Sequence, residues 1–314
     1  MIRIGVVNID VSHPKRFSEI LLEGNRARYV AVYNDGFRPQ EEVEAFVHNS
    51  KLEKICDSVE ELADCVDIGF IQGCNWDKHL DYVQPFIDRN KPVFIDKPMV
   101  GNVADINKLL ELEKKGAKIL GSSSVRYCYE VREFLDKTEE ERGKVLNVSI
   151  TVGIDEFNYA IHAVEGLCAM IEAKPVSTRF LGTAYRDGDK CETYFVTFAN
   201  GATGQYHCVE GRLCPFHVVA VTTKQDSTFT VNTGKLYIAL LDQICDYLEG
   251  KENYMADMLT ITDAIRVMLA GKASKENGGR EIKVYSKEVE GTSFDGYLFE
   301  KEYAAAAKPM YVME

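Results

Sequence analysis

Short apolar runs alternate with amphipathic, helix-like segments over roughly the first 120 residues, and this alternation constrains the fold more than any other feature of the chain. The runs that we interpret as strands are 2–7, 29–33, 68–71, 92–95 and 118–122, with helices expected near 14–23, 40–49, 59–62, 77–89 and 103–115. Strands that alternate with helices form a parallel sheet through right-handed crossovers. The pattern therefore predicts an α/β domain over residues 1–122.

Beyond residue 145 the β-rich runs become longer and follow one another through tight-turn signals such as Asp187-Gly188 and Asn200-Gly201. These runs are 145–152, 176–184, 192–198, 203–210 and 216–222, with helices expected at 126–137, 158–172, 235–249 and 256–270. We predict an α+β domain over 123–314 with a mostly antiparallel, open sheet. The tail from Phe294 predicts a short helix, to which the sequence assigns no function.

Composition excludes several classes of protein. A formal net charge of −12 disfavours nucleic acids and anionic membranes as partners, and no apolar run approaches the roughly 20 residues that span a bilayer. We expect a cytoplasmic location, because no leader-like segment precedes the first strand and the nine cysteines form no CxxC pair. The only candidate metal cluster has a spacing unlike that of zinc sites, so no metal is expected; it comprises His207, Cys208, Cys214 and His217.

The loop after the first strand carries Asn8, Asp10 and His13 at the three places where a dinucleotide enzyme has the glycines of GxGxxG. Asparagine tolerates a left-handed backbone, whereas Asp10 adds negative charge near a bound pyrophosphate. Together with Ser12, these residues are candidates for cofactor binding. The alternative is an ordinary strand-to-helix turn with Ser12 as the helix cap.

Polar residues also follow the second and third strands of the predicted sheet, where ligands bind in open parallel sheets. Asp35, beside Asn34, is placed to accept hydrogen bonds from an adenosine ribose. The dipeptide Asp35-Gly36 by itself also predicts an ordinary turn. After the strand 68–71, the residues predicted to line the cofactor cleft are Gln72, Asn75, Trp76 and His79.

Asp96-Lys97-Pro98 follows the fourth strand, so that Lys97 stands at the mouth of the sheet. This tripeptide resembles the Glu-Lys-Pro of the Gfo/Idh/MocA family of NAD(P)-dependent oxidoreductases. The segment from Gly121 to Tyr127 resembles the family segment with an Arg-aromatic pair, and 158–165 resembles its Asp-x-Gly-x-His-x-x-Asp motif, with an asparagine in place of the first acid. On a helix, residues 158, 162 and 165 share one face.

The resemblance implies a Rossmann-type first domain that binds NAD, with NADP not excluded, and a second domain that binds substrate. It implies that Lys97 polarises the reacting oxygen and that His162 accepts a proton from the hydroxyl of a sugar, cyclitol or related polyol. Asp96 and Lys97 join the cofactor-binding residues. The residues that the resemblance places at the substrate are Arg126, Asn158, Tyr159, His162 and Glu165.

Two alternatives use the same fold. One is a noncatalytic sugar- or partner-binding protein that lost cofactor turnover, and the other is a lyase or epimerase with retained NAD. The open antiparallel sheet predicts a homodimer or homotetramer, because its uncovered face is most simply covered by a second copy of the chain.

Overall fold

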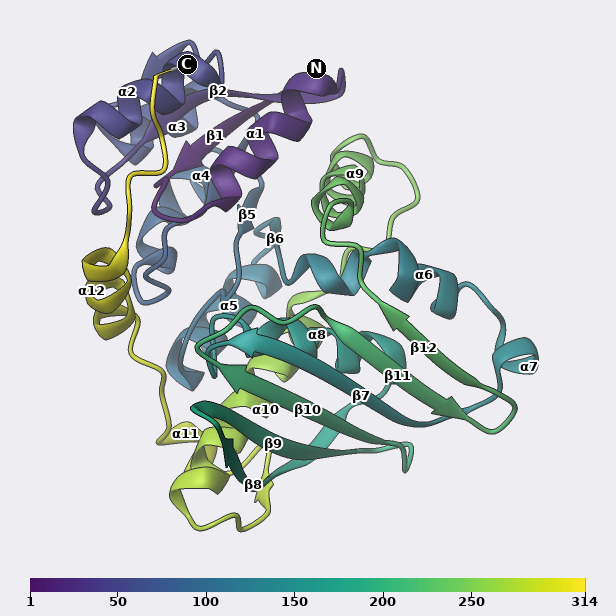
Figure 1. Ribbon diagram of the computed structural model, residues 1–314. Coiled ribbons are helices and arrows are strands. Elements are labelled where there is room, and N and C mark those ends of the chain that lie inside the picture. The colour runs from purple at the N-terminus through teal and green to yellow at the C-terminus, as the bar shows by residue number, and fades with distance from the viewer. Residues whose placement is uncertain (314) are drawn as a thin grey trace.

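The computed structural model describes residues 1–313, which build two sheets with helices around them (Figure 1). The first sheet has six parallel strands in the order β3-β2-β1-β4-β5-β6. Its strands are β1 (Ile2–Val7), β2 (Ala27–Tyr33), β3 (Lys54–Ile55), β4 (Ile68–Ile71), β5 (Val93–Ile95) and β6 (Ile119–Gly121). The predicted parallel α/β domain is confirmed, and the short edge strand β3 is an addition that carries too few residues to show an apolar pattern.

The helices of this domain are α1 (His13–Glu23), α2 (Gln40–Asn49), α3 (Val59–Cys65), the 3-10 turn η1 (His79–Tyr82), α4 (Gln84–Ile87) and α5 (Val103–Lys114). The single helix expected over 77–89 is broken into η1 and α4. Pro85 has no N–H to donate within a continuous helix, so a new helix starts around it. Ser12 stands at the N-cap of α1, but its side chain makes no capping hydrogen bond.

The second sheet has seven strands in the order β12-β11-β7-β10-β9-β8-β13. Its strands are β7 (Val145–Ile154), β8 (Pro175–Arg186), β9 (Asp189–Phe198), β10 (Thr203–Glu210), β11 (His217–Thr222), β12 (Asp226–Thr230) and β13 (Ile282–Lys283). Only β7 and β10 pair in parallel, and the other pairs are antiparallel, as predicted.

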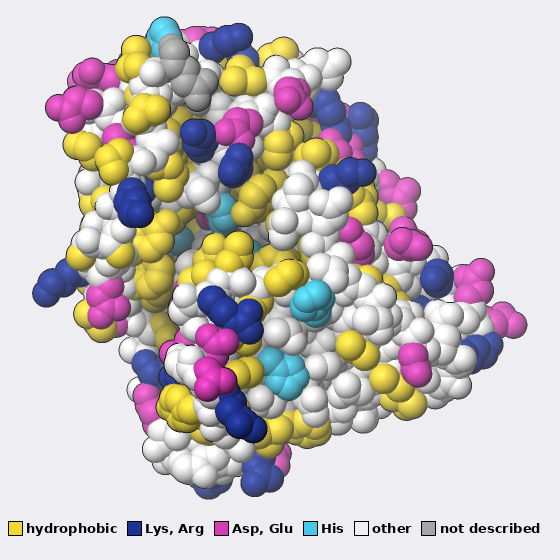
Figure 2. All heavy atoms as spheres, viewed as in Figure 1, with side chains coloured by type: hydrophobic (Ala, Val, Ile, Leu, Met, Phe, Trp, Pro, Cys, Tyr) yellow, Lys and Arg dark blue, Asp and Glu magenta, His cyan; other side chains and the backbone are white. Residues whose placement is uncertain are grey.

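The remaining helices are η2 (Ser124–Tyr127), α6 (Tyr129–Leu135), α7 (Glu139–Arg142), α8 (Ala160–Ile171), α9 (Leu236–Leu248), α10 (Met258–Glu276), α11 (Lys287–Glu290) and α12 (Gly296–Ala306). All twelve residues of α8 are buried. Helices α8 and α10 lie behind the second sheet in Figure 1, while its other face is open and, in Figure 2, largely uncharged. None of the helices in residues 1–313 is long and apolar enough to cross a membrane.

The two domains share their packing. Helix α9 belongs to the second domain in sequence, yet its Leu240 and Ile244 lie in one apolar cluster with Ile4 and Phe17 of the first. Arg26, which directly precedes β2 in the first domain, forms ion pairs with three acidic groups of the α9 region, among them Asp246 at 2.6 Å. This packing fixes the position of the second domain relative to the carboxyl ends of β1 to β6, where ligands bind in such sheets.

Candidate active site at the domain junction

The crevice of the first sheet lies at the carboxyl ends of β1 and β4, because the strand order reverses between these neighbours. Asn8 directly follows β1 and has a left-handed backbone with φ of 65°. Its side chain accepts a hydrogen bond from the backbone N–H of Asp35 at 2.9 Å. Asn8 therefore provides the backbone conformation of the first glycine, and its side chain also holds the loop after β2.

Asp10, at the place of the second glycine, is 1% exposed, and its carboxylate fastens two loops together. Oδ1 accepts a hydrogen bond from the N–H of Phe37 (3.2 Å), and Oδ2 accepts one from the N–H of Cys74 (3.1 Å). A Cβ on Gly36 would lie 2.0 Å from Oδ1, so only glycine fits there. Burial raises the pKa of Asp10 to about 6.

The other predicted cofactor residues differ in what they contact. Asp35 stays at the crevice, where it accepts a hydrogen bond from the Tyr82 hydroxyl at 2.7 Å. Asn34 accepts one from the N–H of Ile9 at 3.2 Å and so orders the loop. Gln72 and His79 are buried: Gln72 accepts a hydrogen bond from Tyr29, and His79 contacts the carbonyls of Gly73 and Met99.

Asn75 and Trp76 bond to the C-terminal segment of the chain. The Asn75 side chain donates to Glu300 and the Trp76 indole donates to the carbonyl of Phe294, both at 2.9 Å. One ligand atom each of Asp10, Cys74 and Glu300 lies within 4.8 Å of the other two. The backbone of Asn8 and the carboxylate of Asp35 fit a dinucleotide, but Glu300 stands over the loop that would approach its pyrophosphate.

His13, at the place of the third glycine, forms a buried pair with Asp96 from the Asp-Lys-Pro segment. Its Nδ1 donates to Oδ2 of Asp96 at 2.5 Å. Burial alone would raise the pKa of Asp96, but the charge and the hydrogen bond of His13 lower it below its ordinary value. The carboxylate thereby fixes the orientation of the imidazole, whose Nε2 is left for other partners.

Lys97 reaches from the end of β5 to the start of the second domain. Its Nζ donates to the backbone carbonyl of Asn158 (3.0 Å) and to the Asn158 side-chain oxygen (2.9 Å), and lies 5.2 Å from the ring centre of Tyr159. Burial lowers the pKa of Lys97, while the carboxylates of Asp96 and Asp155 oppose this shift.

His162, in the first turn of α8, is buried and shares a 2.6 Å hydrogen bond between its Nδ1 and the Ser123 hydroxyl. Burial, with the positive charges of Lys97 and His13, lowers its pKa well below the ordinary value. His162 is therefore neutral near pH 7. Within residues 1–313, neither its Nε2 nor that of His13 has a hydrogen-bond partner.

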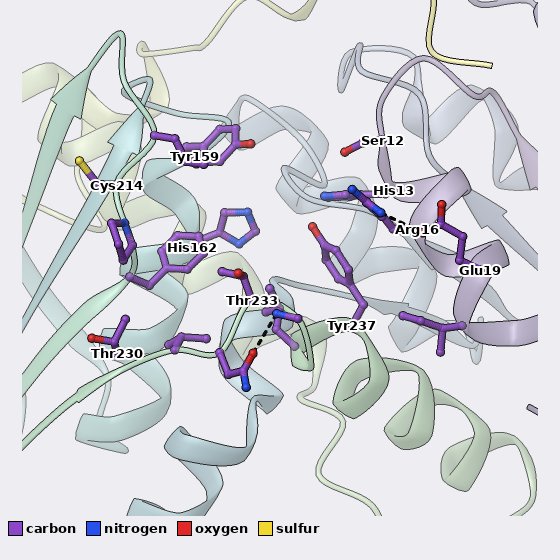
Figure 3. Close-up of a pocket in the computed structure, with 18 residues that line it drawn as sticks. Ser12, His13, Arg16, Glu19, Tyr159, His162, Cys214, Thr230, Thr233 and Tyr237 are labelled. Carbon is purple, nitrogen blue, oxygen red and sulfur yellow. Dashed lines mark hydrogen bonds and ion pairs between the residues drawn. The ribbon is translucent and has the colours of Figure 1, made fainter. Parts of the chain in front are cut away.

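Both imidazoles line one cavity of about 980 Å³ between the domains. In Figure 3 His13 and Arg16 approach from α1, His162 and Tyr159 from the second domain, and Tyr237 from α9. Figure 2 shows histidine side chains within the hollow between the domains. The full lining is Ser12, His13, Arg16, Glu19, Ile20, Tyr159, His162, 213–216, 230–234, Leu236 and Tyr237.

Two predicted substrate residues lie elsewhere. Arg126 and Glu165 are both buried and bond to each other, with Nε of Arg126 donating to Oε2 of Glu165 at 2.7 Å, and neither lines the cavity. The sequence missed the lining residues of the loops 213–216 and 230–234 and Tyr237, since no local motif marks a loop that reaches the cavity only through the second sheet.

His207 and Cys208, of the candidate metal cluster, point to opposite faces of β10, as neighbours in a strand do.

Comparison with known proteins agrees with this geometry. Residues 2–124 match the sequence model of the Gfo/Idh/MocA family, described as an oxidoreductase family with an NAD-binding Rossmann fold. The predicted resemblance to this family is therefore confirmed over the N-terminal domain, and the same match supports the predictions of an oxidoreductase and of NAD as cofactor. A comparison with curated protein sequences finds no match.

Solved structures share the fold over nearly the whole chain. A "probable dehydrogenase" from Thermotoga maritima has a TM-score of 0.78 at 16% identity, covering 91% of this chain and 99% of that one. The myo-inositol dehydrogenase from Lactobacillus casei, solved with NAD(H) and myo-inositol, has a TM-score of 0.73 at 13% identity, covering 91% and 97%. The UDP-N-acetylglucosamine 3-dehydrogenase from Acidithiobacillus ferrooxidans has a TM-score of 0.69 at 12% identity, covering 87% and 97%.

The raised pKa of Asp10 predicts a dependence of stability on pH. An acid whose pKa is raised on folding stabilises the fold below its unfolded pKa, and this stabilisation is lost as the pH rises through the folded value. Between pH 4 and pH 7 the free energy of unfolding of the wild type should fall relative to that of Asp10→Asn by about 3 kcal/mol, as a shift of two pKa units requires. Chemical unfolding at each pH measures this difference. The exposed control Asp57→Asn should show none, and parallel curves for wild type and Asp10→Asn would contradict the assignment.

The Arg126–Glu165 pair predicts a large effect on stability. Arg126→Met leaves the carboxylate of Glu165 buried without its partner, and the free energy of unfolding should fall by about 3–5 kcal/mol. Urea denaturation measures the loss. The double variant Arg126→Met with Glu165→Met should recover part of it, whereas the exposed control Arg186→Met should change little. A loss below 1 kcal/mol for Arg126→Met would show that the pair is dispensable.

Proposed function

We propose that this protein oxidises a hydroxyl group of a sugar, cyclitol or related polyol with NAD as hydride acceptor, or catalyses the reverse reduction. The observation that carries the proposal is the bond of Lys97, from the end of β5, to Asn158, which directly precedes Tyr159 in a segment whose Tyr159 and His162 line a cavity between the domains. Dehydrogenases of myo-inositol and of a sugar nucleotide among the solved structures of this fold support the substrate class.

His162 acts in this proposal as the proton acceptor. Its lowered pKa keeps the imidazole neutral, and its bond to Ser123 leaves Nε2 to face the cavity. Lys97 donates a hydrogen bond to the oxygen on which charge develops and so stabilises that charge. NAD supplies the site that accepts the hydride.

Asn158 and Tyr159 position Lys97 and the substrate. The side-chain oxygen of Asn158 accepts a hydrogen bond from Lys97 and directs Nζ toward the second domain. An amide cannot relay a proton as a carboxylate does, so proton transfer rests on His162 and not on residue 158. The cofactor residues of the proposal are the loop from Asn8 to His13, Asp35 and Asp96, and a carboxylate at residue 35 favours NAD over NADP.

The cavity itself suits a hydroxylated ring. Tyr159, Phe216 and Tyr237 present aromatic faces, while Thr230 and Thr233 offer hydroxyl groups. Aromatic faces pack on the C–H side of a ring, and hydroxyl groups exchange hydrogen bonds with its oxygens. The open face of the second sheet supports a homodimer or homotetramer, and we propose a cytoplasmic location for the assembly.

A second candidate, a lyase or epimerase with retained NAD, is favoured by one observation. Oxidation of an alcohol needs a single base, but His13 and His162 each direct a free Nε2 toward the same cavity from different domains. An enzyme that also breaks a C–H bond beside the oxidised centre uses a second group that transfers protons, and His13, whose Nδ1 is held by Asp96, lies at the cavity for this role. Incubation with polyols in D₂O separates the two candidates, since carbon-bound deuterium in the recovered polyol requires proton exchange at carbon, which hydride transfer alone does not produce.

The assignment of Lys97 and His162 predicts the outcome of substitution. Lys97→Met and His162→Gln should each lower turnover about 10²- to 10⁴-fold, because each removes a group that acts in the transition state. The measurement is polyol-dependent formation of NADH at saturating NAD, beginning with myo-inositol. His48→Gln, on the exposed side of α2, is the matched control and should retain turnover.

The same assignment predicts the pH profile. Because the pKa of His162 is lowered, the neutral base persists on acidification, and the acid limb of kcat/KM should lie below pH 6.5. Full turnover in both variants, or an acid limb above pH 7, would exclude His162 as the base.

A further inference from the structure

The C-terminal segment, residues 294–312, leaves the second domain and returns across the first. It starts beside α5, where the N–H of Phe294 donates to the carbonyl of Gly101. In Figure 1 it is drawn in yellow: α12 stands beside the lower part of the first domain, and the chain after it runs upward past the first sheet toward α2. Neither the sequence nor the proposed reaction assigns this segment a role.

One side of the segment is fastened to the loop that follows β4. Glu300 accepts a hydrogen bond from the Asn75 side chain and forms an ion pair with Lys78 at 3.1 Å. The N–H of Gly296 donates to Asp77 at 2.8 Å. A Cβ at residue 296 would lie 2.4 Å from the Asn75 side-chain oxygen, so the close approach requires glycine.

The other side is fastened to the loop that follows β2 and to its neighbours. The Tyr303 ring packs against that of Phe37, with 6.0 Å between ring centres, and Arg38 donates to the carbonyl of Lys308 at 2.8 Å. The Tyr311 hydroxyl donates to the carbonyl of Val11, within the loop that replaces the glycine motif. The segment therefore touches both loops that border the switch point and the loop between them.

Through Glu300, the contact between the segment and the first domain extends to Asp10, in the loop after β1. Its carboxylate lies within 4.8 Å of ligand atoms of Asp10 and Cys74, at the point where the backbone of a dinucleotide-binding loop approaches a pyrophosphate. A pyrophosphate bound there would overlap with this carboxylate and would be repelled by its negative charge.

We propose that the segment 294–312 occupies the dinucleotide crevice as an internal competitor, and that NAD binds only when this segment moves away. The inference rests on the proposed NAD-dependent function. Helix α12, the middle of the segment, suits such displacement, because only Gly296 in it is buried and Tyr297 and Leu298 are about half exposed, whereas Phe294 and Tyr311 near the two ends of the segment are buried. Few buried contacts are typical of segments that open locally.

Such competition divides the intrinsic Kd for NAD by the fraction of molecules in which the segment has left the crevice, so the apparent affinity for NAD is lower. Weakening the closed state should therefore tighten NAD binding without new contacts to NAD. Glu300→Ala and Tyr303→Ala, each in the full chain, should lower the calorimetric Kd for NAD about 10-fold, and the double variant by more. Glu302→Ala, on the exposed side of the same helix, is the matched control and should leave the Kd unchanged.

Two readouts on the wild-type chain need no substitution. Trp76 is the only tryptophan and its indole bonds to Phe294, so NAD should change its fluorescence if the segment leaves. Hydrogen exchange of the backbone over 294–312 should become faster with NAD, whereas a segment that closes over bound NAD would exchange more slowly.

The outcomes distinguish the inference from the function on which it rests. Equal NAD affinity in wild type, both variants and the control, with unchanged or slower exchange over 294–312, would overturn the inference and leave NAD-dependent function in place. No NAD binding to any folded variant, including the double variant, would overturn both the inference and the NAD-dependent function, because weakening the closed segment would then have exposed no site for NAD.

Discussion

The buried carboxylate of Asp10 is the interaction on which the site depends. It accepts backbone hydrogen bonds from the loops after β2 and β4, and so holds together the two sides of the switch point. A glycine at this place has no side chain and leaves the loops to be joined by a bound ligand. Here the protein joins them itself, which explains why Gly36 has no room for a side chain and why burial raises the pKa of Asp10 to about 6.

The same replacement occurs at the first and third glycine places. Asn8 keeps the left-handed backbone and adds a side chain that bonds to the loop after β2, and His13 bonds to Asp96 after β5. Side chains of the chain itself thus take over contacts along the whole crevice. With Glu300 beside Asp10, protein side chains occupy the crevice and bond to one another there, whereas the cavity lined by His13 and His162 is open.

The catalytic arrangement depends on the packing between the domains. Lys97 belongs to the first domain and Asn158 and His162 to the second, so their proximity requires a fixed relation between the two. Helix α9 provides it, since its apolar face joins the core of the first domain while its first residues line the cavity. The burial that fixes this relation also lowers the pKa values of Lys97 and His162.

The sequence by itself determined the two sheets and the strand ends that carry the polar residues, because hydrophobic periodicity and position after a strand are local properties. Position after a strand also singled out Lys97, but the roles of Lys97 and His162 came from the resemblance of their motifs to a known family. It did not separate Arg126 and Glu165, which neutralise each other in the interior, from residues that line the cavity. Only the tertiary structure decided that His13 pairs with Asp96, that Tyr237 reaches the cavity, and that Glu300 lies at the switch point. These contacts join residues 83 to about 290 positions apart, and no local pattern encodes which distant side chain fills a given space.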